Sequence, residues 1–232
     1  MPGAALSLLA AAVIAPLLDG PADAPQLSPA WRVATLPRQT KPVTQFSAER
    51  VDGRAAVRID ANESYGNLLH ELQGQTVPRQ LRWAWRMHIP NAATDLHTKA
   101  GDDTPAKVCL SFDLPLEQVP FGERTLLRIF RSSAGEPLPA ATLCWVWGRI
   151  EPRGVLMDNP FTRRVRYMVL RNAADGIDTW FEETRDIAAD FRRAFGDEAP
   201  QMPPLLAVLV GGDSDNTASH TVAHVGALRF EP

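Results

Sequence analysis

The stretch Leu81-Arg-Trp-Ala-Trp-Arg-Met-His-Ile89 alternates between apolar and polar side chains. On an extended strand its apolar residues share one face, while Arg82, Arg86 and His88 share the other. A strand with one buried face and one solvent-facing side is typical of antiparallel sheets. This stretch therefore predicts an antiparallel β-sheet whose buried face carries tryptophan.

Similar short runs, separated by turn signals, recur along the chain. Expected strands cover residues 31–36, 43–51, 55–61, 107–113, 143–148, 165–171, 179–185, 205–210 and 222–230, with strand or helix at 65–72. Helical patterns occur at residues 121–131 and 186–196, the second with Asp186 as N-cap. Strands and helices do not alternate, so the pattern predicts a mostly β fold: an antiparallel β-sandwich or jelly roll with one or two short helices. A single domain would cover residues 28–232.

Composition and the N-terminal segment bear on partners and location. Apolar residues make up 45% of the chain, and the net charge of −3 gives no reason to expect nucleic acid as a partner. Residues 4–18 carry no charge and are followed by Ala22-Asp-Ala24, which predicts a signal peptide at residues 1–24. An uncleaved anchor and a start codon assigned too far upstream are the alternatives. We expect a periplasmic or secreted bacterial protein, with no membrane span once the signal is removed.

Two cysteines, Cys109 and Cys144, lie in strand-like runs. In an oxidising compartment they form a disulfide if their strands are neighbours. They can equally serve as two small buried apolar residues. The sequence leaves both alternatives open.

Two acidic turns form the main candidate site: Gly101-Asp102-Asp103, and Asp213 to Thr217 with Asp215 and Asn216 between them. Because a jelly roll brings distant loops to one rim, these turns could meet. The four carboxylates of Asp102, Asp103, Asp213 and Asp215 are hard oxygen donors of the kind that calcium prefers. The same residue types also build ordinary turns by hydrogen bonding. A hydrogen-bonding role is the preferred interpretation, and calcium is the alternative.

Two further groups are candidate ligand contacts. Trp85 and Trp147 lie on tryptophan-bearing strand faces, where aromatic rings either stack on sugars or fill the core between sheets. The core role is preferred because neighbouring apolar residues share their faces. Glu182 and Arg185 lie in the strand expected at residues 179–185, where Glu182 or Glu183 could complete a glycosidase carboxylate pair with an acidic turn. An ion pair between glutamate and arginine is the preferred alternative.

Familiar catalytic motifs are absent from the sequence. It contains no Gly-x-Ser-x-Gly elbow, phosphate-binding loop or dinucleotide fingerprint. His220 and His224 are four residues apart, but on a strand this spacing separates them by about 13 Å, too far for one metal ion. Whether the protein is an enzyme therefore stays open.

Several motifs together cover about residues 30–231: Leu81–Arg86, Lys99–Asp103 with Ala106–Val108, Cys144–Gly148, Trp180–Arg185 with Asp190-Phe191 and Phe195-Gly196, and Asp213–Thr217. As an ordered set they resemble a bacterial family of exported proteins, the domain-of-unknown-function family numbered 3047. The resemblance implies an exported β-rich domain and no particular reaction.

Three functions follow, in order of preference. The first is non-catalytic binding of a carbohydrate or another polar ligand at the acidic loops of an exported cell-envelope domain, a preference that rests largely on analogy of fold. The second is a structural or interaction protein in which the aspartates only fix loops. The third is a glycoside hydrolase that uses paired carboxylates.

Overall fold

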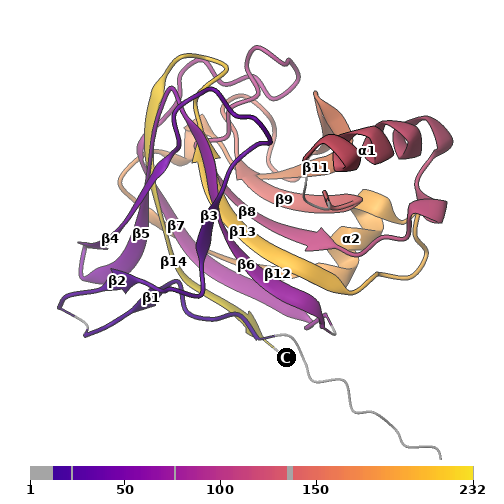
Figure 1. Cartoon of the computed structure of the whole chain (residues 1–232). Helices are drawn as coiled ribbons and strands as arrows, with labels where there is room; N and C mark the ends of the chain where they lie inside the picture. Colours follow the sequence, from indigo (N-terminus) through magenta and orange to yellow (C-terminus); the bar gives the residue numbers. More distant parts are fainter. Residues whose placement is uncertain (1–12, 22, 76, 135–137, 232) are drawn as a thin grey trace, which may run out of the picture.

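The computed structural model describes residues 13–21, 23–75, 77–134 and 138–231. Two sheets pack face to face and form a β-sandwich, which confirms the predicted fold class (Figure 1). The larger sheet has the spatial order β10-β11-β9-β8-β13-β6-β3. Its strands are β3 (Arg32–Ala34), β6 (Tyr65–Gln75), β8 (Ala106–Phe112), β9 (Ala141–Trp147), β10 (Leu156–Asn159), β11 (Thr162–Arg171) and β13 (Leu205–Asp213).

The smaller sheet has five strands in the order β12-β7-β14-β5-β4. Its strands are β4 (Gln45–Val51), β5 (Arg54–Asn62), β7 (Gln80–Ile89), β12 (Trp180–Asp186) and β14 (His220–Glu231). Named strands of both sheets pair antiparallel except β9 and β11, which run parallel. Among the named strands, the antiparallel prediction therefore fails only at that pair, where the chain crosses over through β10 before it returns beside β9.

Both predicted helices form and lie beside β9 and β11 (Figure 1). They are α1 (Phe121–Ala134) and α2 (Ile187–Phe195). Asp186 caps α2 as predicted, since its side chain accepts a hydrogen bond of 2.8 Å from the amide of Ala189. Short 3-10 helices occupy Leu116–Gln118 and Ala173–Asp175. The segment at 65–72, left open between strand and helix, is the strand β6.

Tryptophans from the two sheets meet in the core. The rings of Trp83 and Trp145 lie 5.5 Å apart between centroids, and those of Trp85 and Trp147 lie 5.6 Å apart. All four side chains are at most 2% exposed. Alternation along each strand aims these residues inward, where large aromatic rings bury the most apolar area. The role of these rings is therefore to join the two sheets.

The segment before β3 packs against the sandwich. Two short strands, β1 (Leu18–Asp19) and β2 (Gln26–Leu27), pair as a hairpin. Ile14 and Leu17, which are 8% and 5% exposed, belong to the main core. Cleavage after Ala24 would remove β1 and both of these side chains. Residues 1–12 and 22 of the predicted signal peptide lie outside the described residues, and the signal peptide stays a prediction. In the described part of the chain, no helix is long and apolar enough to cross a membrane.

The loop at residues 90–104 covers the outer face of the larger sheet. Leu96 is fully buried there against Cys109 and Cys144, and its amide donates to the carboxylate of Glu151 at 2.8 Å. Cys109 and Cys144 face each other across β8 and β9 and form a disulfide. The structure therefore contains the disulfide, which was one of the two alternatives for these cysteines. This covering loop carries the first acidic turn onto the sheet.

Candidate functional site

The two acidic turns meet, although 114 positions separate Asp103 from Thr217. Asp103 is fully buried, and its carboxylate accepts hydrogen bonds from the backbone amides of Asn216 at 3.1 Å and Thr217 at 2.7 Å. The Asn216 side-chain amide donates to it at 3.3 Å, and the Thr217 hydroxyl also donates to it. Asp103 therefore has all its oxygens occupied by the second turn and fixes the two loops together.

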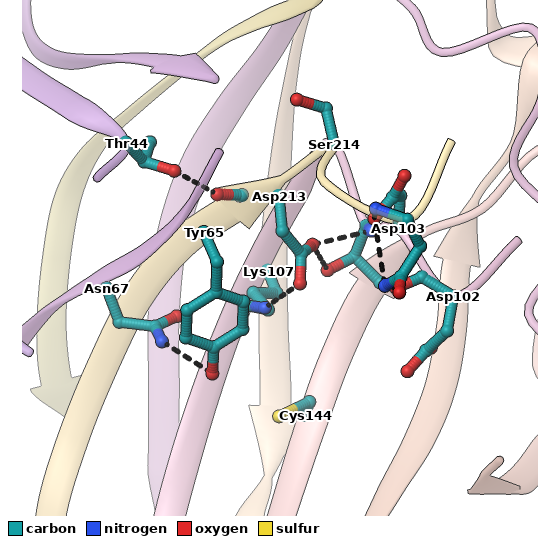
Figure 2. Close-up of polar contacts among 12 residues, drawn as sticks. Thr44, Tyr65, Asn67, Asp102, Asp103, Lys107, Cys144, Asp213 and Ser214 are labelled. Carbon is teal, nitrogen blue, oxygen red and sulfur yellow. Dashed lines mark hydrogen bonds and ion pairs between the residues drawn. The ribbon is translucent and has the colours of Figure 1, made fainter. Parts of the chain in front are cut away.

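Asp213, at the end of β13, is held from two sides (Figure 2). Its Oδ1 accepts hydrogen bonds of 2.7 Å from both the amide and the hydroxyl of Thr104, and Lys107 Nζ lies 2.8 Å from its Oδ2. The Lys107 and Asp213 side chains are 7% and 6% exposed. Burial alone would lower the pKa of Lys107, but Asp213 beside it holds that pKa above its ordinary value. The pair is consequently a buried ion pair.

Asp102 differs from both of these aspartates. Only 5% of the residue is exposed, and its Oδ2 accepts a hydrogen bond of 2.5 Å from the side-chain amide of Asn159. Its Oδ1 is buried and makes no hydrogen bond of ordinary geometry to a described residue, although the nearby Tyr167 hydroxyl acts on the carboxyl to lower its pKa. Burial raises the pKa of Asp102 to about 7, and the nearby charge of Asp213 acts in the same direction. Asp102 therefore carries an unsatisfied buried oxygen and can exchange a proton near neutral pH.

Four polar residues that were not predicted complete the cluster. Tyr65 lies with its ring 4.8 Å from Lys107 Nζ, and its hydroxyl accepts a hydrogen bond of 3.1 Å from Asn67 (Figure 2). Tyr167 accepts a hydrogen bond of 2.7 Å from Asn159, and burial raises its pKa well above the ordinary value. Asn67 also has a buried Oδ1 without a partner within the described ranges. We call Tyr65, Asn67, Asp102, Lys107, Asn159, Tyr167 and Asp213 the outer-face cluster.

The backbone of β13 makes room for this cluster. Gly211 lies beneath Asn67, and a Cβ atom at Gly211 would come within 2.2 Å of Asn67 Oδ1. Glycine is thus required there because the Asn67 side chain crosses the strand at that point. Asn159 in turn is oriented by its own Oδ1, which accepts hydrogen bonds from the amides of Phe161 and Thr162. These contacts fix which side of the Asn159 amide faces Asp102.

Asp215 lies at the edge of the second turn. Burial raises its pKa, with Asp213 and Asp103 contributing in the same direction, and its backbone carbonyl accepts a hydrogen bond of 3.0 Å from Lys41. Among the described residues, no group of three or more histidine, cysteine, aspartate or glutamate side chains is arranged to hold a metal ion. The carboxylates of Asp103 and Asp213 already have protein donors. The geometry therefore gives the expectation of calcium no support.

The remaining predicted contacts lie elsewhere. Trp85 and Trp147 are core residues, so a surface ligand cannot touch them, which corrects their assignment as ligand contacts. Glu182 faces outward on the smaller sheet and pairs with Arg82 at 2.7 Å and Arg54 at 3.3 Å. Arg185 pairs with the buried Asp190 at 2.7 Å and joins β12 to α2. These contacts agree with the ion-pair alternative.

One sequence signal could have identified part of the missed set. Tyr65 and Asn67 lie on one face of β6, and the buried Leu68 lies on the other. Strand periodicity could therefore have predicted that Tyr65 and Asn67 share a face. The sequence could not have predicted that Asn159 and Tyr167 lie beside Asp102, because this arrangement depends on where the covering loop packs. The two turns were correctly expected to be able to meet.

A family model described as "Protein of unknown function (DUF3047)" matches residues 29–229. No curated protein matches the chain. Among solved structures, endoglucanase 3 of Trichoderma harzianum, from family GH12, is similar with 7% identity and a TM-score of 0.41, over 88% of this chain and 98% of that chain.

Proposed function

This chain belongs to the DUF3047 family of proteins of unknown function, and we propose that it is a non-catalytic domain that binds a polar ligand, such as a carbohydrate, at the outer-face cluster. The observation that carries the proposal is the buried Asp102 Oδ1, which makes no hydrogen bond of ordinary geometry to a described residue. A buried unsatisfied acceptor costs about 1–3 kcal/mol and calls for a partner. A ligand hydroxyl supplies the missing donor.

The surroundings of Asp102 support a ligand with both donors and acceptors. Asn67 offers a second unpaired oxygen within the described part of the chain, and Tyr65 and Asn159, which are half-buried, form the accessible side of the cluster. The ion pair of Lys107 with Asp213 leaves no free charge to attract an anion. A neutral, hydroxyl-bearing ligand therefore matches the cluster better than a charged one.

We also propose that the domain works outside the cytoplasm. The Cys109–Cys144 disulfide supports this location, because structural disulfides persist in oxidising compartments such as the periplasm. Fractionation of the producing cell, with the protein detected by antibody and its N-terminus read by mass spectrometry, tests the location. Recovery in the cytoplasm alone would contradict it.

A loop-fixing role is the second candidate function, and the hydrogen bonds to the Asp103 carboxylate favour this role for Asp103. The hydrogen bonds to its carboxylate all come from the second turn, as a structural role requires. The hydrolase alternative has less support, because Glu182 and Asp102 lie on opposite outer faces of the sandwich. Phe181, next to Glu182, packs on Trp147 in the core, while Asp102 contacts Asn159 over the larger sheet.

Calorimetric titration of the full chain with maltohexaose, cellohexaose and chitohexaose tests the binding proposal. For each of these hexasaccharides that binds, Asp102→Asn should weaken the binding at least tenfold. The amide nitrogen that replaces an oxygen cannot accept a hydrogen bond. The matched control is Asp113→Asn, which changes an exposed carboxylate in the same way. Equal affinities for the two variants, or no binding of any of the three probes, would contradict the proposal.

A further inference from the structure

A row of large polar side chains crosses the outer face of the smaller sheet. Trp180 on β12 pairs with Arg86 on β7, Arg86 pairs with His224 on β14, and His224 pairs with Arg58 on β5. Adjacent strands are about 4.8 Å apart, so the row spans about 14 Å. The inward neighbours of these residues, such as Trp85 and Val225, are fully buried in the core. The row therefore faces away from the sandwich interior.

Three consecutive members of this row carry buried nitrogens that make no hydrogen bond to any described residue: Trp180 Nε1, Arg86 Nε and His224 Nδ1. Arg86 and His224 are 9% and 2% exposed. Arg86 Nε retains one ionic neighbour, Asp52 Oδ2, at 3.4 Å. Native structures leave few buried polar atoms unsatisfied, so three in adjacent positions indicate that a partner is missing.

The contacts of the other atoms define what each nitrogen offers. His224 Nε2 lies 3.1 Å from Glu49 Oε2, and since a carboxylate only accepts, Nε2 carries the hydrogen and Nδ1 presents a lone pair. Arg86 is held at its outer end by Asp178, 2.7 Å from its Nη2. Its Nε–H and the Nε1–H of Trp180 are donors. The row thus offers two donors and one acceptor.

We propose that Trp180, Arg86 and His224 form a second site, which binds a hydroxyl group of a neutral carbohydrate. One hydroxyl accepts a hydrogen bond from Trp180 or Arg86 and donates its own proton to His224 Nδ1. An anion has no proton to give and would face the Nδ1 lone pair. A cation would be repelled by Arg86 and Arg58.

The same face continues from the row toward a hollow. Arg58 donates a hydrogen bond of 2.8 Å to Asp60, which also contacts His220 at 2.8 Å. Asp60 and His220 line a cleft of about 380 Å³ together with Pro42, Val43, Gln45, Asn62 and Ser64. That volume lies within the usual range for ligand sites, about 300–1,000 Å³. The cleft therefore lies on the same sheet face as the row, and the hydrogen bond from Arg58 to Asp60 connects the two.

Binding of maltohexaose and cellohexaose to the full chain, followed by calorimetry and tryptophan fluorescence, tests this site. Trp180→Phe keeps an aromatic ring without the Nε1 donor, and His224→Phe removes the acceptor. We expect each to weaken binding at least tenfold. His97→Phe is the control, because His97 is exposed on the covering loop. Thermal unfolding checks that His224→Phe is folded, because this substitution removes the hydrogen bond from Nε2 to Glu49 together with the unsatisfied Nδ1.

The outcomes separate this site from the outer-face cluster. If Asp102→Asn abolishes binding while Trp180→Phe and His224→Phe bind as the unmodified chain does, the second site is refuted and the outer-face proposal stands. The reverse pattern refutes the outer-face proposal and supports the second site. An absence of any binding, with only water satisfying the three nitrogens in a high-resolution crystal structure, overturns the second site.

Discussion

The Asp103 carboxylate accepts hydrogen bonds from both the backbone amide and the hydroxyl of Thr217, and so ties the loop before β8 to the loop before β14. Because the carboxylate is fully buried, its removal leaves the amides of Asn216 and Thr217 without their acceptor. We expect Asp103→Ala to lower the free energy of unfolding by about 3 kcal/mol or more. Urea denaturation measures this, with Asp113→Ala as an exposed control. A loss below 1 kcal/mol would show that the turns are held by other contacts.

The raised pKa of Asp102 makes stability depend on pH. Well below pH 4 this carboxyl is protonated in both the folded and the unfolded chain. As the pH rises toward 7, the unfolded chain ionises while the folded chain keeps its proton, so the folded state loses up to about 4 kcal/mol relative to the unfolded state. Asp102→Asn should remove that fall.

The measurement is the difference in unfolding free energy between the unmodified chain and Asp102→Asn, followed from pH 4 to 8. Subtracting the two curves cancels the titration of other groups, and Asp113→Asn provides the control. A difference that does not change over this pH range would mean that Asp102 titrates as an ordinary carboxyl.

The Lys107–Asp213 pair should also be sensitive to the loss of one partner. Lys107→Met keeps the length of the side chain but leaves the Asp213 carboxylate buried without its counter-charge. We expect a loss of about 3–5 kcal/mol at pH 7. The double variant Lys107→Met with Asp213→Asn should recover part of this loss, and chemical denaturation of the three proteins compares them. No recovery would mean that packing, and not the uncompensated charge, causes the effect.

The disulfide gives a prediction that reducing agent can test. Cys109 and Cys144 are separated by 35 positions, and the chain-entropy model assigns about 4 kcal/mol to closing a loop of that size. We expect Cys109→Ala with Cys144→Ala to lower the melting temperature and to make it insensitive to dithiothreitol. The unmodified chain should melt lower when dithiothreitol is added. If reductant has no effect on it, the bond does not form in solution.

The N-terminal segment offers a fifth test. Removing residues 1–24 takes away the buried Ile14 and Leu17, and it removes the Ala15 and Pro16 carbonyls that accept from the Trp31 indole at 3.2 and 3.0 Å. Burial of two such side chains is worth about 3 kcal/mol or more. The truncated chain should therefore unfold at lower urea concentration than the full chain. Equal stability would show that residues 13–21 do not contribute to the fold.

Local patterns in the sequence determined the class of fold. Strict alternation in Leu81–Ile89 defined a strand with one buried face, and the Asp186 cap with the following apolar spacing defined α2. These features depend on neighbours within one strand or one helical turn, so they are visible without tertiary structure. The prediction of a mostly β sandwich rests on them, whereas the resemblance to the family rests on the ordered set of motifs that includes the two acidic turns.

Only the tertiary structure decided which aspartates hold loops together and which keep an unsatisfied oxygen. Asp102 and Asp103 are adjacent and chemically identical, yet Asp103 meets the donors of Asn216 and Thr217, while Asp102 Oδ1 makes no hydrogen bond of ordinary geometry to a described residue. Register across the three strands β12, β7 and β14 likewise placed Trp180, Arg86 and His224 in one row. Hydrogen bonding depends on the position of atoms contributed by residues far away in the chain, and composition or spacing cannot encode that position. The sequence alone predicted most of the strands and the two acidic turns, and the tertiary structure decided which of the carboxylate oxygens have a hydrogen-bond partner.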